Sequence, residues 1–131
     1  MSVQIDIKVE PKFLPEHSSD AESKYTWLYE ITLINLSDKI VQLINRHWIL
    51  TDLNGHIEEV KGPGVVGLQP IIKPGESFSY SSFCVLHTQS GSMKGSYEMQ
   101  DLDRHKFKVG IPEFLLCNPD QTRKLDSRLL H

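Results

Sequence analysis

Apolar and polar residues alternate with a period of two along most of this chain, and this alternation constrains its fold more than any other feature. Val3, Ile5, Ile7 and Val9 are separated by polar residues, which predicts a half-buried β-strand. No helical pattern precedes residue 117. We therefore predict an all-β antiparallel sandwich of two sheets with seven or eight strands. The further predicted strands cover residues 25–33, 40–51, 57–61, 77–86, 93–99 and 107–111.

Three details refine this prediction. Residues 40–51 are apolar on both faces, so we expect a strand that lies centrally or changes sheet midway. Asn54-Gly55 predicts a hairpin turn, since both residue types tolerate a positive φ. Residues 101–104 form a second polar turn, and Pro112 is expected to stop regular strand pairing.

The length of 131 residues suits one domain, which we place at residues 1–116. Residues 117–131 are predicted to be a C-terminal tail, either a short helix or disordered. Asn118-Pro119 resembles a helix start, but a helix of about 12 residues is marginal on its own.

Composition and charge exclude several classes of function. The net charge of −3 gives no electrostatic footprint for nucleic acid. We expect no secretory signal, and no apolar run in the sequence is long enough to span a membrane. Cys84 and Cys117 form no CxxC motif, so we expect a cytoplasmic protein with two reduced thiols.

Residues 62–67 read Gly-Pro-Gly-Val-Val-Gly and match the G-x-G-x-x-G pattern of dinucleotide-binding folds. That fold needs a helix directly after the glycines, and Pro70 and Pro74 exclude it. Two alternatives stay open. The loop amides form a nest that holds an anion, or the glycines only permit positive φ and close approach. The predicted anion site comprises Gly62, Gly64, Gly67, Arg46 and Lys61.

Other chemistry has little support in the sequence. In a strand, Arg46 and Trp48 share a face and His47 points the opposite way, so Arg46 either covers a core tryptophan or reaches an anionic group. The six histidines show no metal-ligand spacing, and no nucleophile–base signature is present. We predict no catalytic residue, no metal site and no cofactor.

An ordered set of motifs resembles the ApaG family over roughly residues 3–116. The set includes Tyr29 to Asn35, Arg46-His47-Trp48, the glycine motif, Pro74-Gly75, Phe78-x-Tyr80-x-Ser82, Gly91-x-Met93-x-Gly95-x-Tyr97 and Ile111-Pro112-x-Phe114. The chain departs from the family pattern at Phe83, where many members have glycine, and at residues 102–104, where a glycine-containing turn is common.

The resemblance implies a fibronectin type III-like sandwich in a small bacterial cytoplasmic protein. It links the chain to cobalt resistance and magnesium efflux. Related domains in eukaryotic F-box and polymerase-interacting proteins imply a protein-interaction role. Pyrophosphate or nucleotide binding has been proposed at the family's glycine motif.

Three functions follow for testing. The first is a non-enzymatic binding module with an unknown protein partner, favoured if Phe83, Met93 and Met99 are exposed. The second is a small-molecule sensor that binds pyrophosphate or nucleotide phosphates at Gly62–Gly67 with Arg46 and Lys61. The third is a nucleotide hydrolase, for which the sequence shows no base or metal. An exposed sheet edge would also allow a homodimer.

Overall fold

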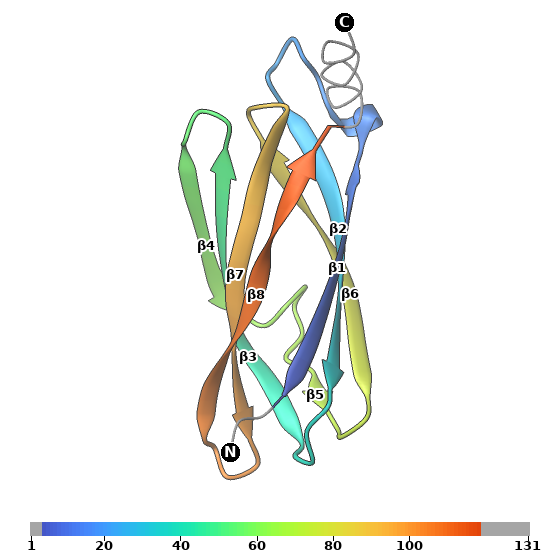
Figure 1. Ribbon diagram of the computed structural model, residues 1–131, viewed down its shortest axis with the longest axis vertical. Helices are drawn as coiled ribbons and strands as arrows, with labels where there is room; N and C mark the ends of the chain where they lie inside the picture. The colour runs from blue at the N-terminus through green and yellow to red at the C-terminus, as the bar shows by residue number, and fades with distance from the viewer. Residues whose placement is uncertain (1–3, 119–131) are drawn as a thin grey trace, which may run out of the picture.

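The computed structural model describes residues 4–118 as two antiparallel sheets packed face to face (Figure 1). This confirms the predicted all-β sandwich, while the finer fibronectin type III label stays a prediction. No helix among the described residues is long and apolar enough to cross a membrane. The predicted tail lies outside these residues from position 119 onward. The elements are β1 (Ile5–Phe13), the 3-10 helix η1 (Pro15–His17), β2 (Tyr25–Asn35), β3 (Val41–Asp52), β4 (Ile57–Pro63), β5 (Ile71–Ile72), β6 (Ser77–Leu86), β7 (Ser90–Asp101) and β8 (Lys106–Cys117).

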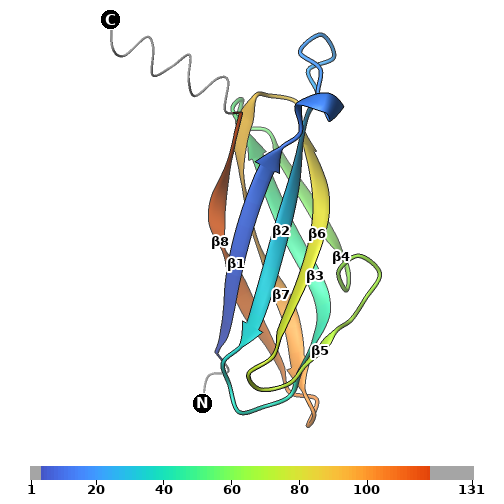
Figure 2. The same cartoon turned by 90° about the vertical axis from the view of Figure 1, so that its right-hand side faces the viewer.

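The two sheets differ in width. One sheet has the strand order β1-β2-β6, and the other has the order β4-β3-β7-β8 with the short β5 paired to one end of β3. Strand β3 is therefore central, as its apolar faces predicted. Figure 2 shows β1 and β8 along one side of the sandwich and β6 and β4 along the other.

The core lies between the sheets and consists of the alternate residues that the sequence pattern selects. Trp27, Leu33, Leu43 and Tyr97 are almost completely buried there. Burying a side chain of this size stabilises the fold by roughly 1.5–3 kcal/mol each. Asn35 is also fully buried. The fold tolerates this polar side chain in its interior because the Asn35 side-chain amide donates to the carbonyls of Lys39 and Ile72.

The prediction for Pro112 was confirmed only in part: regular pairing with β7 is interrupted at Pro112, but β8 continues through it to Cys117. The register between β7 and β8 shifts there: Met93 faces Phe114, whereas Gly95 faces Ile111. Strand β8 is an edge strand, and a proline at an irregularity of an edge strand costs no ladder hydrogen bond.

Candidate functional site

The glycine motif begins at the end of β4, where Gly62 lies opposite Arg46 of β3. A Cβ atom on Gly62 would lie 3.0 Å from both terminal nitrogens of Arg46, so the guanidinium occupies the place of a side chain. Arg46 Nη1 donates to the carbonyls of Pro63, at 3.0 Å, and Gly64, at 3.1 Å. Arg46 thus clamps the first half of the motif through its carbonyl oxygens.

The second half of the motif is a tight two-residue hairpin. Val65 and Leu68 exchange backbone hydrogen bonds, and the residues between them, Val66 and Gly67, both have positive φ. These are the features of a type I′ turn. Gly64 also has a positive φ of 62°, and a Cβ atom there would lie only 2.2 Å from the Leu68 carbonyl oxygen. Steric constraints within the protein therefore explain why glycine occupies positions 62 and 64, without any ligand.

The same hydrogen bonds bear on the predicted anion nest. The N–H of Gly64 donates to the Ile44 carbonyl at 2.7 Å, and the N–H of Val65 donates to the Leu68 carbonyl at 2.8 Å. A nest binds an anion through backbone N–H groups that do not already donate to other acceptors in the protein. The nest stays a prediction, and the hydrogen bonds of this loop give it no support.

Three of the five predicted site residues nevertheless meet in one pocket of about 370 Å³. Arg46, Lys61 and Gly62 line it, whereas Gly64 and Gly67 do not. Its other lining residues include two that the sequence did not single out for this role, His47 and Lys108. The pocket also contains one acidic residue, Glu98, which accepts a hydrogen bond from Asn45 and lies 4.0 Å from Lys106. Its balance of charge is positive.

A second hollow, of about 490 Å³, is a groove between β4 and β6. It lies on the side of the sandwich opposite to β1 and β8, which we call the open side (Figure 2). The buried side chains of Tyr29 and Trp48 line it, together with Val60 of β4 and Phe83 of β6. Phe83 is 64% exposed, as the interaction hypothesis requires. Met93 and Met99 do not meet that expectation, because both lie in the core. Sequence reasoning missed this groove, because the amino-acid sequence alone does not show that β4 and β6 lie on the same side of the sandwich.

Residues 15–101 match the ApaG domain, which is about two thirds of the chain. A protein ApaG of Allorhizobium ampelinum is 50% identical over 122 residues, 93% of this chain and 94% of the relative. The chain belongs to the ApaG family. A protein ApaG of Brucella anthropi shows the same identity and coverage. The crystal structure of the putative ApaA protein from Bordetella pertussis superposes with a TM-score of 0.86 at 39% identity, covering 89% of this chain and 95% of that one.

The buried titratable groups of this ApaG domain have structural roles. The hydroxyls of Tyr80 and Tyr97 hydrogen-bond each other in the core, and burial raises the pKa of both well above the usual value. Burial, with a smaller effect of the Glu58 carboxylate, raises the pKa of Cys84 to about 12. A thiol with that pKa is not a thiolate at neutral pH, so Cys84 is unsuited to nucleophilic chemistry.

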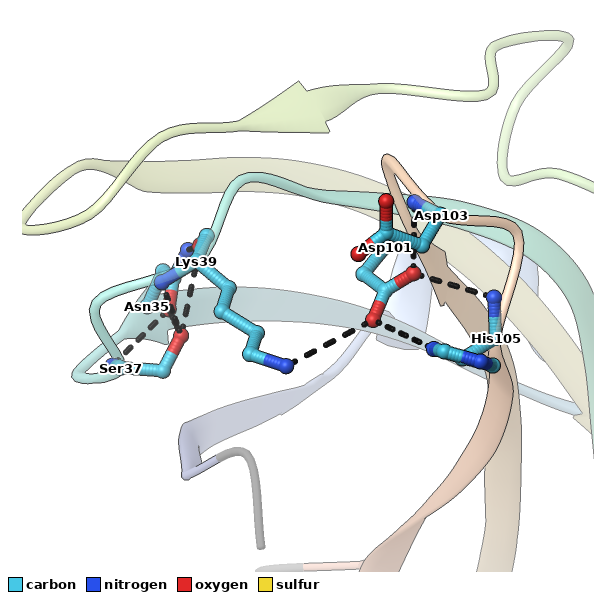
Figure 3. A network of polar contacts seen from close by, with 6 residues as sticks. All are labelled: Asn35, Ser37, Lys39, Asp101, Asp103 and His105. Carbon is cyan, nitrogen blue, oxygen red and sulfur yellow. Dashed lines mark hydrogen bonds and ion pairs between the residues drawn. The ribbon is translucent and has the colours of Figure 1, made fainter. Parts of the chain in front are cut away.

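Asp101, Asp103 and His105 form a cluster of potential metal ligands that sequence reasoning missed (Figure 3). The Asp101 Oδ1 atom accepts the N–H groups of Asp103, at 2.9 Å, and His105, at 3.0 Å. Its Oδ2 atom lies 3.5 Å from the His105 ring and 3.8 Å from Lys39 Nζ. The His105 amide is the main cause that lowers the Asp101 pKa. The Asp101 carboxylate thus caps the β7–β8 hairpin.

Proposed function

We propose that this ApaG protein is a non-enzymatic binding module that contacts another protein through the open side of its sandwich. The distribution of exposed apolar side chains carries the proposal. Of the ten large hydrophobic residues that are exposed in the described part of the chain, seven lie between positions 53 and 83. Two of the seven, Val60 and Phe83, border the groove between β4 and β6, and exposed apolar groups beside a groove are typical of interaction sites. The seven are Leu53, Ile57, Val60, Val66, Leu68, Ile71 and Phe83.

The groove gives this side a specific shape. The groove lies between a wall of β4 that carries Val60 and a wall of β6 that includes Phe83, and the buried residues Tyr29 and Trp48 also line it. A partner side chain placed between the walls would meet apolar and aromatic surface, which is the usual centre of an interface. Glu58 and Arg46 are the charged groups of β4 and β3 that line the same groove.

The links to cobalt resistance and magnesium efflux come from the family resemblance. Mg²⁺ prefers several carboxylate and water oxygens in octahedral geometry. The Asp101 carboxylate is already engaged by two amides and two basic side chains. We therefore propose that any effect on metal homeostasis is indirect and passes through the protein partner.

A photo-crosslinking experiment in cells tests the protein-binding role. Benzoylphenylalanine replaces Phe83 in one variant and, as a control, Leu102 in another, because Leu102 is also exposed but lies in the β7–β8 hairpin. We expect a discrete adduct from position 83 that disappears when Val60→Glu is added, and no such adduct from position 102. An adduct that survives Val60→Glu, or none above the control, would contradict the proposal.

A phosphate ligand is the second candidate, favoured by the positive pocket around Lys61 and Lys108. Gly64→Asp is a poor test of it, since any Cβ at that position collides with the Leu68 carbonyl. Lys61→Gln and Lys108→Gln change exposed side chains and leave the loop intact. Saturable heat with pyrophosphate in wild type, lost in both variants at unchanged melting temperature, would support a sensor. No heat in wild type would exclude it.

A further inference from the structure

The two sheets leave one strand of the sandwich uncovered. The sheet β1-β2-β6 is three strands wide, whereas the five-stranded sheet is four strands wide, because β4 and the short β5 both pair with β3 at the same edge. Strands β1 and β8 lie side by side at one edge, so the surplus strand is β4 at the other edge (Figure 2). Six of the seven residues of β4 are exposed. The place beside β6 and over β4 is therefore the place of a missing fourth strand.

Strand β6 differs from the other edge strands in having no feature that blocks pairing. Natural edge strands carry lysine, proline or irregularities that prevent the addition of another strand. Strand β1 has Lys8 and Pro11, β4 has Lys61 and Pro63, and β8 has Lys106 and Pro112. The ten residues of β6, Ser-Phe-Ser-Tyr-Ser-Ser-Phe-Cys-Val-Leu, include no charge, no proline and no glycine.

The backbone groups at this free edge can be assigned from the pairing with β2. The Asn35 amide donates to the Glu76 carbonyl, and the register continues without a shift through Leu33 opposite Phe78 and Ile31 opposite Tyr80. In an antiparallel pair, hydrogen-bonded and non-hydrogen-bonded residues alternate. The N–H and C=O groups of Ser79, Ser81 and Phe83 therefore point away from β2, toward the open side.

We propose that the edge of β6 accepts an extended segment of a partner protein, which pairs with Ser79, Ser81 and Phe83 and covers β4. This inference rests on the proposed protein-binding function and specifies its mode, which is strand addition. A second copy of this chain does not fit the same place. When two β6 strands pair edge to edge, the β4 strand of each copy projects into the space beneath the other copy's sheet.

The groove also defines the chemistry of the segment. Its alternate side chains would face Tyr29, Trp48 and Val60, so these positions should be apolar. Glu58 lines the same groove and forms no ion pair with any residue that the structure describes. A lysine or arginine two residues from an apolar position would satisfy its charge.

A phage library of random twelve-residue peptides, selected against the intact protein, provides the probe. We expect selected peptides to share alternating apolar residues and one basic residue, and to slow hydrogen exchange at the amides of Ser79, Ser81 and Phe83. Ser81→Pro removes one edge donor that β2 does not use, and it should weaken binding about tenfold. Ser81→Thr keeps the donor and should bind like wild type.

Two further variants keep the test decisive. Ser79→Lys introduces an edge charge without proline and should also weaken binding, which guards against misfolding of Ser81→Pro. Glu58→Lys should reverse the selected charge from basic to acidic. The proposal is overturned if no peptide is enriched, or if the peptides protect other amides or bind Ser81→Pro and Ser79→Lys as tightly as wild type. A Phe83 adduct in cells that persists in Ser79→Lys would reject strand addition and retain the protein-binding function.

Discussion

Two hairpins at opposite ends of the larger sheet have the same loop sequence pattern, Asp-Leu-x-x-His (Figure 1). The Asp52 hairpin joins β3 to β4, and the Asp101 hairpin joins β7 to β8. In both, the aspartate amide donates to the histidine carbonyl, at 3.0 Å and 3.1 Å. In both, the aspartate Oδ1 atom accepts the N–H groups two and four residues later. The side chain of the aspartate therefore defines the shape of the loop.

The hairpins differ at the fourth loop position and around the carboxylate. Gly55 has a φ of 79°, whereas its counterpart Arg104 has a φ of 63°, which is unfavourable for any residue with a Cβ. Asp101 is 8% exposed and has Lys39 and His105 beside it, while Asp52 is only partly buried and has no ion pair with the described residues. The comparison teaches that a capping carboxylate can hold a left-handed residue without glycine, at a cost in strain.

The largest effect should come from removing the two carboxylates. Asp52→Ala leaves two loop amides without their acceptor and should cost roughly 1–3 kcal/mol of the free energy of unfolding. Asp101→Ala should cost more, because it also leaves Lys39 and His105 without their anionic partner. Urea unfolding of both variants measures the difference. Equal losses would show that the surrounding charges of Asp101 contribute nothing.

The pH dependence of stability should separate the hairpins further. The folded-state pKa of Asp101 is lowered below the ordinary value of 3.8, chiefly by the His105 amide. Its contribution to stability is therefore fully present above pH 3.8 and is lost as the pH falls through the lower folded-state pKa. We expect the stability difference between wild type and Asp101→Asn to shrink as the pH falls below about 4. A difference that grows as the pH falls below about 4 would contradict the assigned direction.

The alternation of apolar residues predicted every long strand, because the faces of a sandwich differ in polarity. It did not show that β8 continues past Pro112 to Cys117, since a strand's position at the sheet edge is a tertiary property. The hairpin turn expected at Asn54-Gly55 forms, and Gly55 has a positive φ whereas Asn54 does not. The aspartate oxygen, not the Asn-Gly pair, closes that loop. The similarity of residues 101–105 to this loop is visible in the sequence once the two segments are aligned.

The candidate site was less predictable from the sequence, because its geometry depends on tertiary structure. Sequence reasoning selected Arg46, Lys61 and Gly62, which do line one pocket. It did not show that Arg46 would donate to the carbonyls of its own loop, because that contact depends on the register of β3 and β4. The groove beside Phe83 depends on the unequal widths of the two sheets, and only the complete topology shows this.

A glycine test isolates the conformational part of the comparison. A Cβ atom on Gly55 would have no heavy atom within 4 Å, so Gly55→Ala introduces no collision. Its cost is the left-handed conformation alone, about 1–2 kcal/mol. Thermal unfolding measures this loss. An unchanged melting temperature would mean that the loop shifts to a conformation with negative φ.

Arg104→Gly is the reverse substitution and should have the smallest effect, with the opposite sign. Relieving the positive φ favours glycine, but glycine also gains freedom in the unfolded chain, so the net stabilisation should be about 0.5–1 kcal/mol. Arg104→Ala serves as the control, since it removes the guanidinium and keeps the strain. Stabilisation by glycine but not by alanine would assign the gain to the backbone. If both variants are equally stable, the strain at Arg104 is negligible and the Asp101 carboxylate fully determines the loop.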